Sequence, residues 1–116
     1  MLRFSSQISK IVEKVTRLAG SSTDPAEYAK EFIARICPTN LPYALDSEAA
    51  FPVAGFNGRG LADDVMDVML TLTTNTALGD GVTPDKRRMQ AEFPYFGEPY
   101  ASTQQVAAAA QVSKNK

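Results

Sequence analysis

The densest group of polar residues in the sequence lies between residues 57 and 67. It reads NGRGLADD from Asn57 to Asp64, and a further carboxylate, Asp67, follows. On a helix, Asp63 and Asp67 would share one face and Asp64 would lie one step around it, while Arg59 stands just before the turn and can fold back onto them. The pattern favours a structural lock of charge-assisted bonds formed by Arg59, Asp63, Asp64 and Asp67. A calcium site is the alternative, because calcium takes carboxylate oxygens.

Two further interpretations of the acidic residues have less support. The run DGVTPD from Asp80 to Asp85 suggests a calcium loop, but no further ligands follow Asp85, and a turn with an aspartate cap before Lys86 explains the same letters. The neighbouring acids at 63, 64 and 67 lie on one short element, whereas the two carboxylates of a glycosidase must flank a bond. Catalysis therefore has the weakest support of the three chemistries.

The amino-acid composition argues against several classes of function. The chain has 116 residues, no histidine and one cysteine, with Lys+Arg 12 against Asp+Glu 13. The missing histidine removes the usual general base and the usual zinc ligand, and one cysteine can form no internal disulfide. A net charge of −1 argues against a nucleic-acid binder. We expect no enzyme, and a carboxylate-only hydrolase is the sole enzymatic alternative left.

The N-terminal residues carry no pattern of an export signal or a membrane span. The uncharged stretch from Phe4 to Ser9 is short and half polar, and a secretory signal needs an apolar run of about 7 to 15 residues. Apolar residues instead recur at helical spacing from Ile8 to Leu18, which predicts a helix over 6–19 that ends at Gly20. Its basic residues lie on other faces. We expect it to pack on a core, with membrane-peripheral or partner docking through residues 6–19 as the alternative.

The remaining pattern predicts a mainly α fold of three short helices joined by long, ordered, irregular loops. Asp24, Pro25 and Glu27 form a helix start signal, and Cys37-Pro38 ends this second helix, predicted over 25–36. The third helix is predicted over 61–73 with Gly60 as its cap, although its β-branched end also fits a strand.

The predicted organisation is one small domain over residues 1–100. It comprises a helical hairpin over 1–37 and a motif region over 38–100. The segment from Phe93 to Tyr100 is rich in proline and aromatic residues, which predicts a lid that covers a core. The alternative is that these aromatic residues form a platform for a ligand. The tail over 101–116 fits a short helix or a disordered segment.

Three motifs resemble a known family. FPVAGFNGRGLADDVMDVMLTL, DGVTPDK and EFPYFGEPY occur in this order between Phe51 and Tyr100. They resemble the C-terminal part of a bacterial family catalogued as domain of unknown function 4331. Its motif positions fall on Asn57, Gly58, Arg59, Leu61, Asp63, Asp64, Asp67, Asp80, Gly81, Phe93, Pro94 and Tyr95. The chain departs at Gly60, where the family tends to arginine, and at Tyr100, where it tends to histidine, and residues 1–36 do not align.

The resemblance implies an exported or periplasm-like compartment and assigns no chemistry to the motif residues. The family's large main body is absent from this sequence. We therefore predict a non-catalytic structural or interaction module, an accessory subunit that docks on a larger protein assembly. Its predicted docking surfaces are the basic first helix and the aromatic residues Phe93, Tyr95, Phe96 and Tyr100. The alternative is a small ligand- or calcium-binding module that uses Asp63, Asp64 and Asp67, and no other cofactor is expected.

Overall fold

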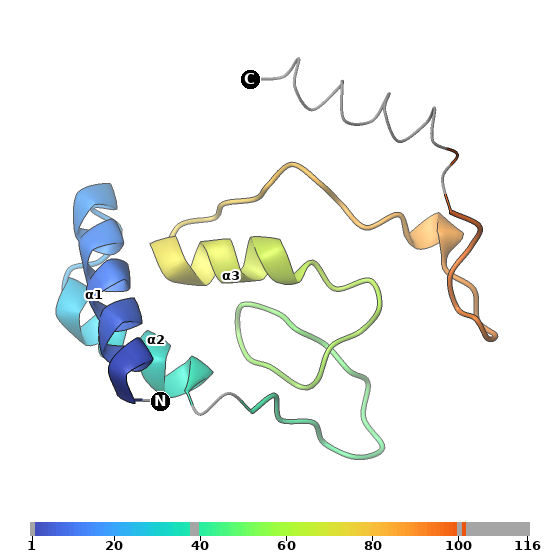
Figure 1. Ribbon diagram of the computed structural model, residues 1–116, viewed down its shortest axis with the longest axis horizontal. Coiled ribbons are helices and arrows are strands. Elements are labelled where there is room, and N and C mark those ends of the chain that lie inside the picture. The colour runs from blue at the N-terminus through green and yellow to red at the C-terminus, as the bar shows by residue number, and fades with distance from the viewer. Residues whose placement is uncertain (1, 38–39, 100, 102–116) are drawn as a thin grey trace. The chain divides into compact units, whose positions relative to one another are not determined.

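The fold is mainly α, as the sequence predicts. The computed structural model describes residues 2–37, 40–99 and 101. Its helices are α1 (Leu2–Ala19), α2 (Pro25–Ile36) and α3 (Val65–Thr74), followed by the single 3-10 turn η1 (Lys86–Arg88) (Figure 1). In the described ranges the only β pairings are two isolated bridges. None of the described helices is both long enough and apolar enough to cross a membrane.

The chain separates into two compact units, Met1–Asp80 and Gly81–Lys116. The first unit contains α1, α2 and α3, and the second contains η1. Residues 102–116, nearly all of the predicted tail, lie outside the described residues. The single domain predicted over residues 1–100 stays a prediction.

Helix α1 is longer than predicted. It begins at Leu2 rather than Ser6. The additional residues include no proline or glycine, so nothing in the sequence stops the helix from extending toward the N-terminus. The predicted end is confirmed: α1 stops at Ala19, and Gly20 adopts a left-handed backbone with φ +62°. Glycine reaches this conformation without a steric penalty, which makes it a frequent residue just past a helix end.

Helix α2 has the predicted bounds. The Asp24 side chain accepts a hydrogen bond from the backbone N–H of Glu27 at 3.0 Å, and Pro25 occupies the start of the helix. The cap satisfies one of the backbone donors that have no partner within the helix. The carboxylate of Glu27 pairs with Lys30 at 2.8 Å.

The first unit has a small hydrophobic core. Helix α1 packs against both α2 and α3. The buried apolar side chains are Val12, Ala29, Phe32 and Leu72. Half-buried apolar residues pack around them, among them Phe56 from the loop before α3. Thr16 is also buried, and its hydroxyl donates to the Val12 carbonyl at 2.8 Å, so burial leaves this hydroxyl satisfied.

Helix α3 begins four residues later than predicted, at Val65 rather than Leu61. The predicted cap, Gly60, is wrong: Asp64 is the N-cap, and its carboxylate accepts from the N–H of Asp67 at 3.1 Å. The preceding Asp63 folds back to accept from the N–H of Gly60 at 2.6 Å, and this tight turn occupies the residues that were expected to be helical. The strand alternative is excluded, because the β-branched residues 71, 73 and 74 all lie within the helix.

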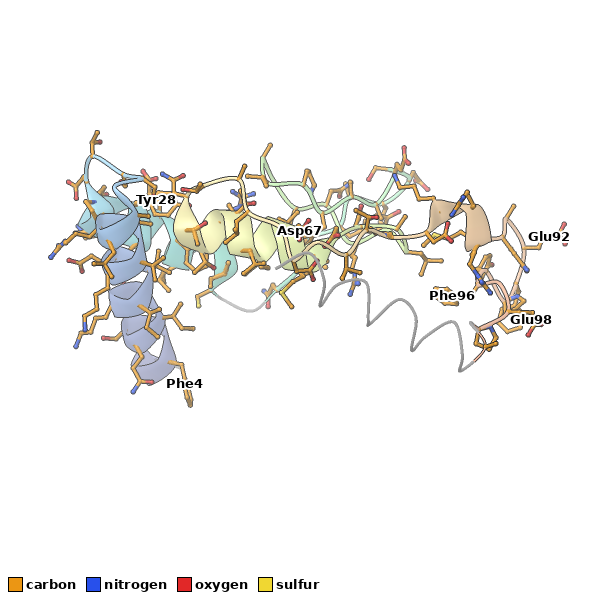
Figure 2. All side chains as sticks on the ribbon, turned by 90° about the horizontal axis from the view of Figure 1, so that it is seen from above. Phe4, Tyr28, Asp67, Glu92, Phe96 and Glu98 are labelled. Atoms are coloured by element: carbon orange, nitrogen blue, oxygen red, sulfur yellow. The ribbon has the colours of Figure 1, made fainter. Side chains whose placement is uncertain are left out.

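Side chains from the α1–α2 hairpin cap the C-terminal end of α3. The hydroxyl of Tyr28 donates to the Leu72 carbonyl at 2.5 Å, and the hydroxyl of Ser21 donates to the Thr74 carbonyl at 2.6 Å (Figure 2 labels Tyr28). Asn75, left-handed with φ 50°, donates from its amide to the Ser21 carbonyl at 2.6 Å. The last carbonyls of a helix have no partner within it, so these bonds join the hairpin to α3. Burial raises the pKa of the Tyr28 hydroxyl above its ordinary value.

The second unit contains a short turn-like element after η1. Asp85 caps η1 by accepting from the N–H of Arg87 at 3.3 Å. Residues Met89 and Phe96 form an antiparallel bridge, and the N–H of Gly97 donates to the Arg88 carbonyl at 2.7 Å. The chain between the bridged residues therefore folds back on itself and carries the aromatic residues at its bend.

Candidate functional site

The acidic residues of the motif region gather at the N-terminal end of α3, in a different combination from the predicted one. One carboxylate oxygen from each of Asp64, Asp67 and Asp80 lies within 4.8 Å of the other two. We call these three residues the acidic triad. Asp63 is not a member, because its carboxylate is turned toward the backbone of Gly60. Asp67 lies in the first turn of α3, where Figure 2 labels it.

The triad is formed because the chain after α3 returns to the start of that helix. The N–H of Asp80 donates to Oδ1 of Asp67 at 2.7 Å. One turn further along α3, the Thr71 hydroxyl lies 3.2 Å from both the N–H and the carbonyl of Leu78. A Cβ atom on Gly79 would lie 2.7 Å from Oδ2 of Asp67, so only glycine allows this approach without a shift. The returning segment thus places a third carboxylate beside two that belong to the helix.

One member of the triad, Asp67, lines an open hollow of about 420 Å³. The hollow lies between α3, the returning segment and Val53 of the loop before α3, and its lining residues are Val53, Asp67, Val68, Thr71, Ala77, Leu78 and Gly79. Three carboxylates this close repel one another, and a hard cation with oxygen ligands would relieve that repulsion. Chemically, the arrangement can therefore bind a cation.

Arg59 does not take part in the site. It is exposed, and none of the ion pairs formed by the described residues includes it. The lock predicted from Arg59 to Asp63, Asp64 and Asp67 has no described contact to support it. The carboxylate of Asp63 accepts from the N–H of Gly60 within the loop, and the carboxylate of Asp64 caps α3.

The residue that organises this region is Asn57, which sequence reasoning placed only within the motif. Its side-chain oxygen accepts from the N–H of Ala44 at 2.8 Å. Its amide nitrogen donates to the Ser47 hydroxyl at 2.8 Å and to the Glu48 carbonyl at 2.9 Å. Its backbone pairs in both directions with Ala50 at 2.9 Å. Asn57 therefore holds the loop that precedes α3 in shape, which is a structural role.

Gly58, the next motif residue, is also structural. It is buried with φ +70°, and its N–H donates to the Pro42 carbonyl at 2.6 Å. A Cβ atom there would lie 2.9 Å from the ring of Tyr43. A glycine is required at this position for both reasons, the left-handed backbone and the close ring. The Asn57-Gly58 pair was the available sequence signal for such a turn.

A stacked aromatic pair attaches the same loop to α2. The rings of Phe51 and Phe56 are parallel within 6°, with their centroids 4.1 Å apart. The guanidinium of Arg35 lies 4.6 Å from the centroid of Phe56 and donates a hydrogen bond to the Val53 carbonyl. These contacts let the loop stay ordered without regular secondary structure, since they pin individual side chains.

The aromatic residues predicted as a docking surface are exposed where the structure describes them. Phe93 is 85% exposed, Phe96 58% and Tyr95 45%. The rings of Phe93 and Tyr95 meet edge to face with centroids 6.0 Å apart. Tyr100 lies outside the described residues. The lid role stays a prediction, and the exposure of Phe93 and Phe96 is compatible with docking to a partner.

Comparison with known proteins gives no family, relative or neighbour: no family model matches the chain, and no curated protein or solved structure is significantly similar.

Proposed function

We propose that the chain is a non-catalytic structural or interaction module that docks, as an accessory subunit, on a larger protein assembly. The observation that carries this proposal is the mismatch between the composition of α3 and its burial. Six of its ten residues are Val, Met or Leu, and at helical spacing they cover more than half of the helix circumference, yet Leu72 alone among them is buried. A wide apolar face on a helix normally packs against other parts of a protein.

The uncovered part of α3 is the face that includes Met66, which is 56% exposed. The other apolar residues of α3 are half-buried: Val65, Val68, Met69 and Leu70. Exposed apolar patches on a single chain commonly mark sites of protein contact. The first unit buries apolar side chains only around its small core. A partner that covers this side of α3 would bury the remaining apolar side chains of the helix. The exposed aromatic residues Phe93, Tyr95 and Phe96 offer a second contact on the other unit.

Self-association of the isolated chain tests this proposal. Light scattering coupled to size-exclusion chromatography should show a molar mass that rises with protein concentration, because the uncovered face of α3 has no partner. Met66→Lys should lower that association. Leu45→Lys is the matched control: Leu45 is 85% exposed, but it stands in the loop before α3 and not on α3 itself. A monomer at all concentrations, or equal effects of the two substitutions, contradicts the proposal.

A second function, cation binding, is supported by the acidic triad alone. The predicted calcium ligands were Asp63, Asp64 and Asp67, and the proposed set is now Asp64, Asp67 and Asp80, because these carboxylate oxygens converge. Binding to the folded state raises stability by RT ln(1 + [L]/Kd), about 2.7 kcal/mol at a calcium concentration 100 times Kd.

Thermal melting in calcium and in chelator tests the cation site. Calcium should raise the melting temperature of the wild type and of the control Asp63→Asn, and it should leave Asp80→Asn unchanged. The comparison uses only the calcium-dependent shift, so a change in the basal stability of either variant does not affect it. No shift of the wild type at millimolar calcium excludes the site.

A further inference from the structure

Three large apolar side chains form a straight exposed stripe along α1. Phe4, Ile11 and Leu18 are 70%, 55% and 89% exposed. They stand seven residues apart, which is nearly two helical turns, so they share one face over about 21 Å of helix. Figure 2 shows Phe4 projecting from the end of α1. We call these three residues the outer stripe.

A row of exposed polar residues runs beside the outer stripe. It consists of Gln7, Lys10, Lys14 and Arg17. At helical spacing, Lys14 is a surface neighbour of both Ile11 and Leu18. The one acidic residue of α1, Glu13, is paired with Arg17 at 2.5 Å.

Lys10 and Lys14 appear in none of the ion pairs among the described residues. On the other side of the stripe, α1 turns its Val12 and Thr16 face to the core. Around the helix, the order is therefore a basic row, an exposed apolar stripe and a buried face.

We propose that the outer stripe and its lysines bind an anionic lipid surface, with α1 lying in the plane of the interface. A basic row beside an apolar stripe is the pattern of interfacial amphipathic helices. Phe4, Ile11 and Leu18 would enter the boundary between headgroups and acyl chains. The long stems of Lys10 and Lys14 would reach back so that their ammonium groups meet the lipid phosphates.

The charge and the exposed area of the outer stripe argue against a second copy of the chain, or another protein, as its binding partner. A second copy of α1 would bring its lysines opposite Lys10 and Lys14, and like charges at a contact oppose association. The three stripe side chains expose roughly 400 Å² together, since a large apolar side chain contributes on the order of 100 to 200 Å². A stable protein interface buries about 800 Å² per partner. A lipid surface has no such requirement, because each inserted side chain contributes separately.

This surface is separate from the side of α3 on which the proposed function rests. The two proposals therefore fail independently: α1 can bind lipid whether or not α3 has a protein partner.

Co-sedimentation of the full chain with vesicles tests the lipid proposal. Vesicles of phosphatidylcholine with about a third phosphatidylglycerol should bind the chain, binding should weaken as salt rises, and vesicles of phosphatidylcholine alone should bind much less. Each lysine near an anionic surface contributes about fivefold in affinity. Lys10→Gln with Lys14→Gln should thus weaken binding roughly 25-fold. The matched control, Lys86→Gln, removes an exposed lysine on the other unit and should leave binding within twofold, about the error of such a measurement.

A second pair of variants tests the apolar part. Leu18→Ser changes a side chain that is 89% exposed, so folding should persist, and circular dichroism checks it. It should weaken vesicle binding at least fivefold, whereas the control Leu45→Ser should not.

Equal binding to both kinds of vesicle, an equal loss with Lys86→Gln, or no binding to the anionic vesicles overturns the proposal. So does a loss of self-association with Leu18→Ser in a chain that binds no vesicle, because the stripe would then be a protein contact.

Discussion

We predict that the side chain of Asn57 contributes more to the stability of the first unit than the side chain of Arg59 does. Asn57→Ala removes three hydrogen bonds, to Ala44, Ser47 and Glu48. A typical intramolecular hydrogen bond contributes about 0.5 to 1.5 kcal/mol net. Asn57 is half-buried, and water can reach part of the groups it leaves behind, so the expected loss is about 2 to 3 kcal/mol.

The matched control is Arg59→Ala, two residues further along the same loop. Arg59 is exposed and enters no ion pair of the described residues, so its loss should change the free energy of unfolding by less than about 0.5 kcal/mol. Equilibrium unfolding in urea, followed by circular dichroism, gives both values. If the lock predicted from Arg59 to Asp63, Asp64 and Asp67 formed, removal of the arginine would instead cost about 1 to 3 kcal/mol. A loss above 1 kcal/mol for Arg59→Ala, or none for Asn57→Ala, refutes the assignment.

Three further substitutions test the packing of the first unit in the same urea assay. Tyr28→Phe should lose about 1 kcal/mol at pH 7 with its bond to α3. The raised pKa of Tyr28 contributes stability that is complete below pH 10 and is lost as the pH rises toward the folded-state pKa, so the variant should lose less stability than the wild type in that range. If the wild type and Tyr28→Phe lost equal stability as the pH rises, this contribution of Tyr28 would be refuted. Gly58→Ala should cost about 1 to 3 kcal/mol, because of its φ of +70° and the ring of Tyr43, and a neutral result would show that the turn can relax. Phe32→Ala, at a buried position, should cost about 3 to 5 kcal/mol and leave little folded protein, and a fully folded variant would show that the core lies elsewhere.

The helix ends that depend on residues close in sequence could be predicted from the sequence. Asp24 and Pro25 define the start of α2, and Gly20 follows the end of α1, because a cap and a left-handed glycine act within a few residues. The start of α3 was wrong for a related reason. Both Gly60 and Asp64 can cap a helix, and the choice depends on the fold-back of Asp63, which composition does not reveal.

Only part of the acidic triad could be predicted from the sequence, because the triad joins residues that are distant in sequence. Asp64 and Asp67 were found as neighbours on one helix. Asp80 joins them only because the chain returns along α3 through Gly79, a path that helical periodicity cannot show. Similarly, the bond from Tyr28 to Leu72 spans 44 positions and has no sequence signal.

We propose that α3 carries an apolar surface that a protein partner covers. Fluorescence of the dye anilinonaphthalene sulfonate, measured on the folded chain in dilute solution, tests it most directly, since the dye binds exposed apolar surface. The wild type should bind the dye while its circular dichroism remains helical, and Met66→Lys should reduce that binding more than Leu45→Lys does. A folded wild type that binds no dye, or a Met66→Lys variant that binds as much as the wild type, would contradict the claim.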